Sequence, residues 1–168
     1  LATSFFFIPL TIIAEPTLEE VVVSARKVDE NLQDVPIAMS VFTSSDIEDA
    51  GIQRPEDFIA LTPNVVMANT VNVGDTLVTI RGLTSTRDAE SNFAFVVDGV
   101  LQTNPNACNS ELLDIAQIEV LKGPQGALYG RNATSGAILI TTKAPSEESE
   151  STAVIGLGVN DTTKLQFV

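Results

Sequence analysis

The stretch Ile118–Thr142, IEVLKGPQGALYGRNATSGAILITT, joins two strand-like runs through a glycine-rich connection. Ile118–Leu121 and Ala137–Thr142 are apolar and rich in Ile and Leu, which is typical of buried strands. The connection between them is predicted to be a tightly folded loop because it contains Gly123, Gly126, Gly130 and Gly136. It lacks the sequence of a phosphate-binding loop, of a dinucleotide site and of a nucleophile elbow. A structural connection and a ligand-binding loop both remain open on these residues alone.

The overall charge limits the classes of partner. The chain has 168 residues, with 9 Lys and Arg against 22 Asp and Glu, and a net charge of −13. Binding to nucleic acid requires a basic face, so this balance argues against a nucleic-acid partner. The chain has no His, which removes the commonest general base and metal ligand, and one Cys cannot form an internal disulfide. Few groups are therefore left for catalysis.

The first residues predict part of an export signal. Phe5–Ala14, FFFIPLTIIA, is almost wholly apolar and too short to span a bilayer as a helix. This is typical of the apolar region of a secretory signal, with Ala14 as the cleavage residue; the alternative is a buried strand. Neither an initiator Met nor a basic start precedes it, so residues 1–14 are expected to be a partial signal peptide.

A short apolar segment follows in polar surroundings. Val21, Val22 and Val23 favour an extended backbone, and charged residues lie on both sides of them. An exposed segment of this kind is suited to adding a strand to the edge of a partner's sheet. The alternative is that it forms the first strand of the domain itself.

Alternating strands and short helices are predicted between residues 36 and 101. Pro36–Thr43 predicts a strand, and Ser45 with Glu48 matches a capping box for a helix that ends near Gly51. Pro55 predicts the first turn of a second helix, which Pro63 ends. The remaining strands are expected at Val65–Ala68, Leu77–Ile80, Phe93–Val97 and Val100–Leu101, and a last hairpin at Ala153–Val159 and Lys164–Val168.

Four stretches together resemble TonB-dependent outer-membrane receptors. They are LEEVVVSARKVDENLQDVPIAMSVF, TIRG, FVVDGV and IEVLKGPQGALYGRNATSGAI, in this order. The resemblance implies an α/β fold of the α+β type: a small mixed-sheet plug with short helices, then a truncated first hairpin of a transmembrane β-barrel. The expected boundaries are 1–14 for the partial signal, 15–34 for the TonB box and flexible linker, 35–145 for the plug, and 146–168 for a linker and the first barrel strands. Two residues depart from the family pattern: Ser135 replaces a usual Gly, and Lys122 a common Arg.

The resemblance also implies a function, namely gating of active import across the outer membrane of a Gram-negative bacterium. The cargo would be a ferric siderophore or another large, scarce nutrient, and the plug would face the periplasm inside its own twenty-two-stranded barrel. The alternative is a free-standing periplasmic module for binding or regulation. No catalytic residue, metal ligand or cofactor is implied, and the chain is not expected to be an enzyme.

The resemblance assigns three sets of residues. The C-terminal domain of TonB would bind Glu20, Val21, Val22, Val23, Ser24 and Ala25. Arg81 and Arg131 would anchor the plug to glutamates of the barrel wall, because guanidinium groups grip carboxylates with two hydrogen bonds. Substrate contacts are expected in the loops that contain Thr84, Ser85, Arg87, Asn104 and Asn106.

Overall fold

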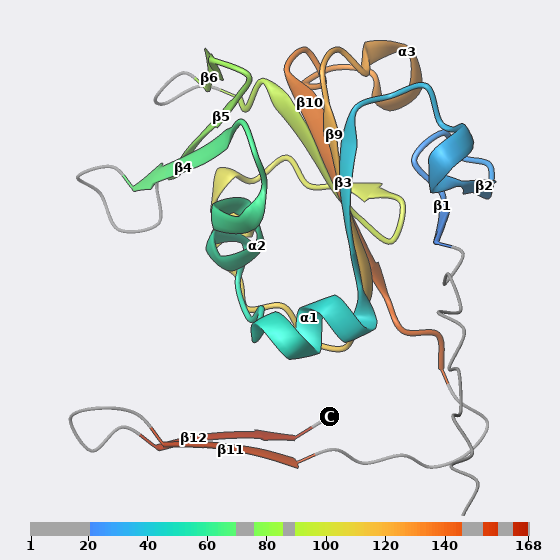
Figure 1. Cartoon of the computed structure of the whole chain (residues 1–168). Helices are drawn as coiled ribbons and strands as arrows, with labels where there is room; N and C mark the ends of the chain where they lie inside the picture. Colours follow the sequence, from blue (N-terminus) through green and yellow to red (C-terminus); the bar gives the residue numbers. More distant parts are fainter. Residues whose placement is uncertain (1–20, 70–75, 86–89, 146–152, 158–162, 168) are drawn as a thin grey trace, which may run out of the picture.

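The computed structural model describes residues 21–69, 76–85, 90–145, 153–157 and 163–167 (Figure 1). At its centre lie β9 (Ile115–Lys122) and β10 (Gly136–Thr142), the strands that the two apolar runs predict, and they pair antiparallel. The predicted signal peptide and Arg87 lie outside the described residues.

Three further strands complete a five-stranded mixed sheet in the order β3-β9-β10-β7-β8. β3 (Met39–Thr43) pairs antiparallel with β9 and forms one edge. β7 (Phe93–Val97) runs parallel to β10, and β8 (Val100–Leu101) turns back beside β7 to form the other edge. Asp98 holds the ends of the parallel pair together, since its carboxylate accepts bonds from the backbone N and hydroxyl of Thr142 at 2.8 and 3.0 Å.

The first helix begins earlier than the sequence predicts. α1 (Ser44–Ala50) is capped by Thr43 and Asp46, and not by Ser45 and Glu48. The Asp46 carboxylate accepts the Thr43 backbone N–H at 2.9 Å, and this hydrogen bond lowers the pKa of Asp46. The prediction at Ser45 is therefore wrong, because Thr43, at the end of β3, already satisfies the free N–H groups of the first turn.

The other helices are short. α2 (Pro55–Leu61) starts at the predicted Pro55. α3 (Gly126–Tyr129) is a single turn inside the glycine-rich loop, and two 3-10 turns, η1 (Leu32–Asp34) and η2 (Pro105–Asn109), lie in connections. Within the described residues no helix has the length and apolar character needed to cross a membrane.

The two faces of the large sheet are covered differently. Ile118 and Val120 of β9 join the larger core with Ile47 of α1 and Phe58 of α2. Leu121, on the opposite face, joins a smaller core that includes Ala25 and Tyr129. Figure 1 shows α1 and α2 on one side of β3 and the N-terminal hairpin on the other. The sheet is therefore the middle layer between helices and an N-terminal segment.

Among the described residues, three small sheets accompany the large one. β4 (Val65–Asn69), β5 (Thr76–Ile80) and β6 (Leu83–Thr84) form an antiparallel sheet above α2 in Figure 1. β1 (Val22–Val23) pairs with β2 (Glu30–Asn31). The predicted C-terminal hairpin is present as β11 (Ala153–Leu157) and β12 (Thr163–Phe167), which pair antiparallel.

Candidate functional site

The segment that the resemblance assigns to TonB lies against the large sheet. Val23 and Ala25 are 1% and 0% exposed, whereas Val22 is 49% exposed. Alternation of this kind places every second side chain of an extended segment inside. Val22 and Val23, within the range 15–34 expected as TonB box and flexible linker, pair with Glu30 and Asn31, so this short segment occupies the position of a first strand of the domain. Glu20 lies outside the described residues.

Three side chains of the sheet and the glycine-rich loop hold this segment. Gln117 Nε2 donates to the Val22 carbonyl at 3.0 Å, and Glu119 Oε1 accepts the Ser24 backbone N–H at 3.0 Å. Tyr129 OH donates to the Ala25 carbonyl at 2.7 Å. These three bonds join a side chain to the backbone and so constrain the path of the segment, and the Ser24 hydroxyl also donates to Glu119 Oε1 at 3.4 Å.

Glu119 is the unusual member of this group. It is 2% exposed, and within the described part of the chain its Oε2 has no hydrogen-bond partner. Burial raises the pKa of Glu119, and the bonds from Ser24 oppose this only in part. Burial, with the nearby Glu119 charge, also raises the pKa of Tyr129 to about 12, so Tyr129 keeps the proton that it donates.

Replacing Glu119 by Gln is expected to change how stability depends on pH. Because its pKa is raised in the folded state, that state binds the proton more tightly than the unfolded state does. The contribution of Glu119 to the stability of the wild-type chain therefore falls as the pH rises from the ordinary range of a glutamate toward neutrality. Gln keeps an acceptor oxygen for Ser24 and does not titrate. We expect Glu119→Gln to match wild type near about pH 4 and to exceed it near about pH 7.

Urea unfolding at several pH values measures this difference, and Glu48→Gln, an exposed position on α1, is the control. A stability difference between Glu119→Gln and wild type that stays constant from acid to neutral pH would contradict the assignment.

Arg81 and Lys122 form a positive pair next to the glycine-rich loop. Arg81 has a left-handed backbone, φ 50°, and lies so near Gly123 that a Cβ there would be 3.3 Å from its Nη1. Lys122 Nζ donates to the Pro63 carbonyl at 3.2 Å, and burial and then Arg81 lower the pKa of Lys122. Among the described residues Arg81 has no ion-pair partner. The guanidinium of Arg81, one of the two predicted anchors, is therefore available to pair with a carboxylate.

Arg131, the other predicted anchor, is already paired. It lies on the loop after α3 and forms an ion pair with Glu90. Both side chains are largely exposed, so the pair contributes little to stability and can exchange for another carboxylate. The two predicted anchors thus differ, since only Arg131 must release a partner before it can bind a barrel wall.

The predicted substrate residues fall in two separate loops. Thr84 is exposed on β6, and its hydroxyl accepts a bond from Thr79 at 3.0 Å. Ser85 is buried, and its Oγ lies 3.1 Å from the Val78 carbonyl and 2.9 Å from Asn92 Oδ1. A substrate contact by Ser85 would require its hydroxyl to leave these acceptors. Asn104 is exposed just before η2, and Asn106 lies within η2.

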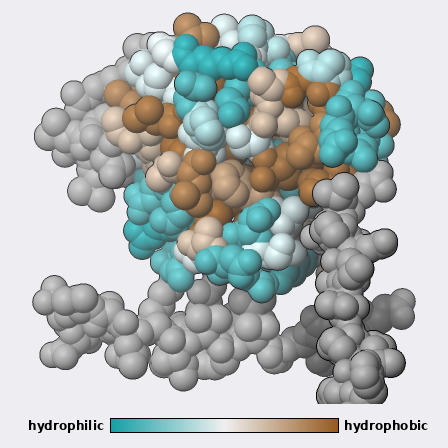
Figure 2. Space-filling model, viewed as in Figure 1, coloured by the Kyte–Doolittle hydropathy of each residue, from teal (hydrophilic) through white to brown (hydrophobic). Residues whose placement is uncertain are grey.

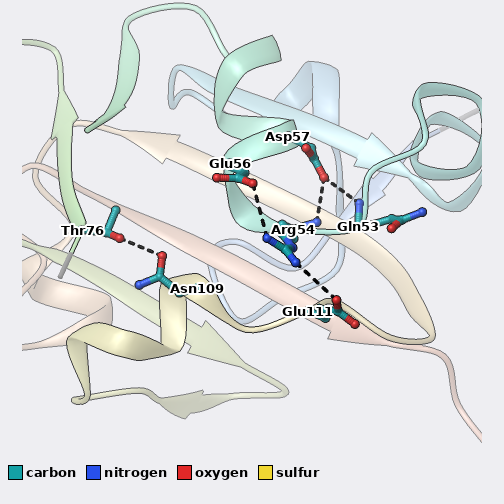
Figure 3. A network of polar contacts seen from close by, with 7 residues as sticks. All are labelled: Gln53, Arg54, Glu56, Asp57, Thr76, Asn109 and Glu111. Atoms are coloured by element: carbon teal, nitrogen blue, oxygen red, sulfur yellow. Dashed lines mark hydrogen bonds and ion pairs between the residues drawn. The ribbon is translucent and has the colours of Figure 1, made fainter. Parts of the chain in front are cut away.

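A polar network braces the loop that contains Asn104 and Asn106 (Figure 3). Thr76 Oγ1 at the start of β5 donates to Asn109 Oδ1 of η2 at 2.7 Å. Arg54, before α2, reaches Glu111 at 3.5 Å, and Asp57 accepts the Arg54 backbone N–H at 2.8 Å. The figure shows Arg54 between Glu56 and Glu111, so α2 is tied to the chain that leads into β9.

Asn92 lies in the loop between β6 and β7 and joins it to the glycine-rich loop. Its backbone carbonyl accepts the N–H groups of Thr134 and Ser135 at 2.9 Å each, and the Ser135 hydroxyl lies 3.1 Å from Asn92 Oδ1. Ser135, which departs from the family pattern, therefore adds a bond that Gly could not form. Reasoning from the sequence missed Asn92, Gln117, Glu119 and Tyr129. A detectable signal existed only for Glu119, a lone carboxylate within a buried strand.

The chain is similar to a known domain family over most of its length. The family model described as TonB-dependent Receptor Plug Domain matches residues 31–137. The pesticin receptor of Yersinia enterocolitica is 27% identical over 154 residues, which cover 91% of this chain. The iron-regulated outer membrane virulence protein of Vibrio cholerae is 30% identical over 148 residues, or 80% of this chain. The chain spans 22% of the length of each of these relatives.

Solved structures show the same fold. The ferric yersiniabactin uptake receptor FyuA of Yersinia pestis superposes with a TM-score of 0.68 at 29% identity, covering 78% of this chain and 21% of that one. The ferripyoverdine receptor of the Pseudomonas aeruginosa outer membrane gives a TM-score of 0.72 at 21% identity, covering 88% of this chain and 19% of that one. The second likeness supports the fold alone, and in both the similarity is confined to a minor part of a longer chain.

Proposed function

The chain belongs to the TonB-dependent receptor plug domain family, and from this we propose that it gates an active importer in the outer membrane. In this proposal residues 35–145 form the plug, residues 15–34 reach toward TonB, and residues 146–168 lead into a surrounding barrel. Its relatives are transport receptors, which supports transport and not catalysis as its role. The cargo we propose is a ferric siderophore or a nutrient of similar size, since FyuA is described as a ferric yersiniabactin uptake receptor.

The position of the N-terminal segment is the observation that carries the proposal. Val22–Ala25 lies outside the large sheet and is held by side chains and by the two-residue strand β2. Its departure would break none of the backbone pairs among β3, β9, β10 and β7. A partner that binds extended peptides by strand addition could thus take hold of this segment while the plug remains folded.

The surface of the domain is compatible with a position inside the wall of a surrounding barrel. Figure 2 shows apolar residues spread across the middle of one face, with hydrophilic residues above and below them. Val66, Val100 and Leu61 are each more than half exposed. Arg81 adds a positive charge without a described partner, which supports its pairing with a carboxylate of the wall. Arg131 would join it after releasing Glu90.

Uptake in the native bacterium tests the proposal. Deleting the gene that encodes this chain is expected to abolish growth on one scarce nutrient in a screen of ferric siderophores, cobalamin and sugars, and a plasmid copy should restore it. Unchanged growth on every nutrient in the screen would contradict the importer. The gene product should also be recovered from the outer-membrane fraction.

Complementing the deletion with Val22→Pro is expected to lower the uptake rate at least about tenfold. Proline removes the backbone N–H at position 22, which strand addition to TonB would use. The Val22 carbonyl faces Gln117, away from β2, so the β1–β2 pairs and the fold should persist. Val22→Ala keeps the N–H and is the matched control, expected to transport as wild type. Unchanged uptake together with unchanged TonB binding would reject this segment as the TonB-binding site.

A further inference from the structure

The turn between β7 and β8 contains the one Asp-Gly sequence among these 168 residues, Asp98-Gly99. Val97 pairs with Val100, so Asp98 and Gly99 form the whole loop. Their φ angles are 46° and 78°, and two positive values in a two-residue loop define a type I′ hairpin turn. Both residues are exposed. The turn is therefore well formed, and water reaches it.

An aspartate that precedes glycine can isomerise without an enzyme. The backbone nitrogen of the glycine attacks Cγ of the aspartic acid, so that a C–N bond forms and a carboxyl C–O bond breaks. The amide proton and the hydroxyl leave as water, and a five-membered succinimide remains. Water then opens the ring at either carbonyl, which restores aspartate or yields isoaspartate, whose backbone runs through Cγ. Glycine favours the attack because it has no side chain to shield its nitrogen.

The carboxylate of Asp98 is held in a position that opposes this attack. Its Oδ1 accepts the Thr142 N–H at 2.8 Å, and its Oδ2 accepts the Thr142 hydroxyl at 3.0 Å. The Asp98 backbone N–H donates to the Ile140 carbonyl at 3.0 Å. All three bonds join Asp98 to the end of β10. For Cγ to reach the Gly99 nitrogen, the carboxyl group must turn away from Thr142 and lose both of its bonds.

We infer that Asp98 is a modification site, at which isoaspartate forms when the end of β10 separates from β7, and that Thr142 is the residue that restrains the reaction. Both partners of the carboxylate belong to Thr142, so one local opening there frees it. Local openings of this kind occur more often than unfolding of a whole domain. The rate of isoaspartate formation therefore reports how often this end of the sheet opens.

Isoaspartate at position 98 would not fit the same turn. The backbone between Asp98 Cα and Gly99 gains one carbon atom, whereas the type I′ geometry is specific to a loop of two ordinary residues. The free carboxylate is then attached directly to Cα, so it no longer reaches the N–H and hydroxyl of Thr142. The modification thus keeps open the end of the sheet whose opening produced it. Because Thr142 is the last residue of β10, the chain that follows loses this attachment.

Incubation of the purified 168-residue chain tests the site. Isoaspartate is counted by methyl transfer from radiolabelled S-adenosylmethionine with an isoaspartyl methyltransferase, and mass spectrometry with electron-transfer fragmentation assigns it to position 98. The folded chain is compared with the same chain in urea at equal pH and temperature. We expect isoaspartate to form at position 98 at least about tenfold faster in urea, because the bonds to Thr142 are then absent.

Thr142→Val tests the restraint in the folded chain, since it removes the hydroxyl and keeps the backbone N–H and the branched side chain. It should form isoaspartate at position 98 about fivefold faster than wild type, the effect of one ordinary hydrogen bond on a local opening. Thr62→Val is the matched control, because it also removes a bonded hydroxyl, the one that donates to the Phe58 carbonyl at 2.7 Å. This control should react as slowly as wild type, because its lost bond is not part of the opening at Thr142.

Each result decides a separate claim. Absence of isoaspartate at position 98 even in urea would overturn the modification site, and equal rates with and without urea would overturn the restraint by the fold. The role of Thr142 would be overturned if Thr142→Val reacted no faster than wild type. Equal acceleration by Thr62→Val and Thr142→Val would show that the whole domain must unfold first, which would overturn the local opening.

Discussion

Replacing Gly136 by Ala is expected to destabilise the folded chain by about 3 kcal/mol. Gly136 begins β10 at the point where that strand pairs with Lys122 of β9 on one side and Phe93 of β7 on the other. A Cβ at this position would lie 2.3 Å from the Leu121 carbonyl oxygen and 3.1 Å from Ile80 Cδ1. The Ile80 side chain can move, but the Leu121 carbonyl is part of the sheet backbone. Relief therefore requires the two central strands to separate locally.

Urea unfolding measures this loss, and Gly126→Ala in the same glycine-rich loop is the matched control. A Cβ at Gly126 would meet no atom within 4 Å, and this residue starts α3, where Ala is a better helix former. The control should retain or slightly raise stability. If both variants unfold at the same urea concentration as wild type, that result would contradict the close approach of Gly136 to the Leu121 carbonyl.

Replacing Phe58 by Ala should cost still more, about 4 kcal/mol. Phe58 is 0% exposed and joins the larger core from α2, with its ring centre 6.2 Å from that of Phe42 on β3. Truncation would remove the main side chain through which α2 packs on the sheet and would leave a cavity. The edge strand β3 would lose a ring contact at the same time.

The control for Phe58 lies on the same helix. Leu61 is 55% exposed, so Leu61→Ala should change the unfolding free energy by no more than about 0.5 kcal/mol. Comparing the two variants separates burial from helix propensity, since both introduce Ala into α2. A loss at Phe58 no greater than that at Leu61 would show that α2 does not pack as described.

Local chemistry made much of the fold predictable. Alternating or continuous apolar runs indicated β7, β9 and β10, and Pro55 marked the first residue of α2. The boundary of α1 was missed because Thr43, which ends β3, also caps the helix. Thr43, Ser44 and Ser45 are three consecutive hydroxyl residues, and the path of β3 places Thr43 at the cap.

The arrangement of the candidate site was far less predictable. Glu119 and Ser24 meet across most of the chain, and nothing in either segment specifies the other. The same holds for Tyr129 and Ala25. The apolar character of Val21–Val23 was visible, but whether it was exposed or packed depended on the sheet face that β9 presents. The resemblance to TonB-dependent receptors indicated which segments carry function, and the tertiary structure showed which of these segments contact one another.

The order of strands in the sheet has a consequence for how the chain folds as it is made. The two central strands, β9 and β10, come late in the sequence, while β3 at the edge comes early. Met39 of β3 has its partner at Leu121, and Phe93 of β7 has its partner at Gly136. Such distant partners slow folding because the intervening chain must first close into a loop. A ribosome must therefore complete nearly the whole domain before the sheet can assemble.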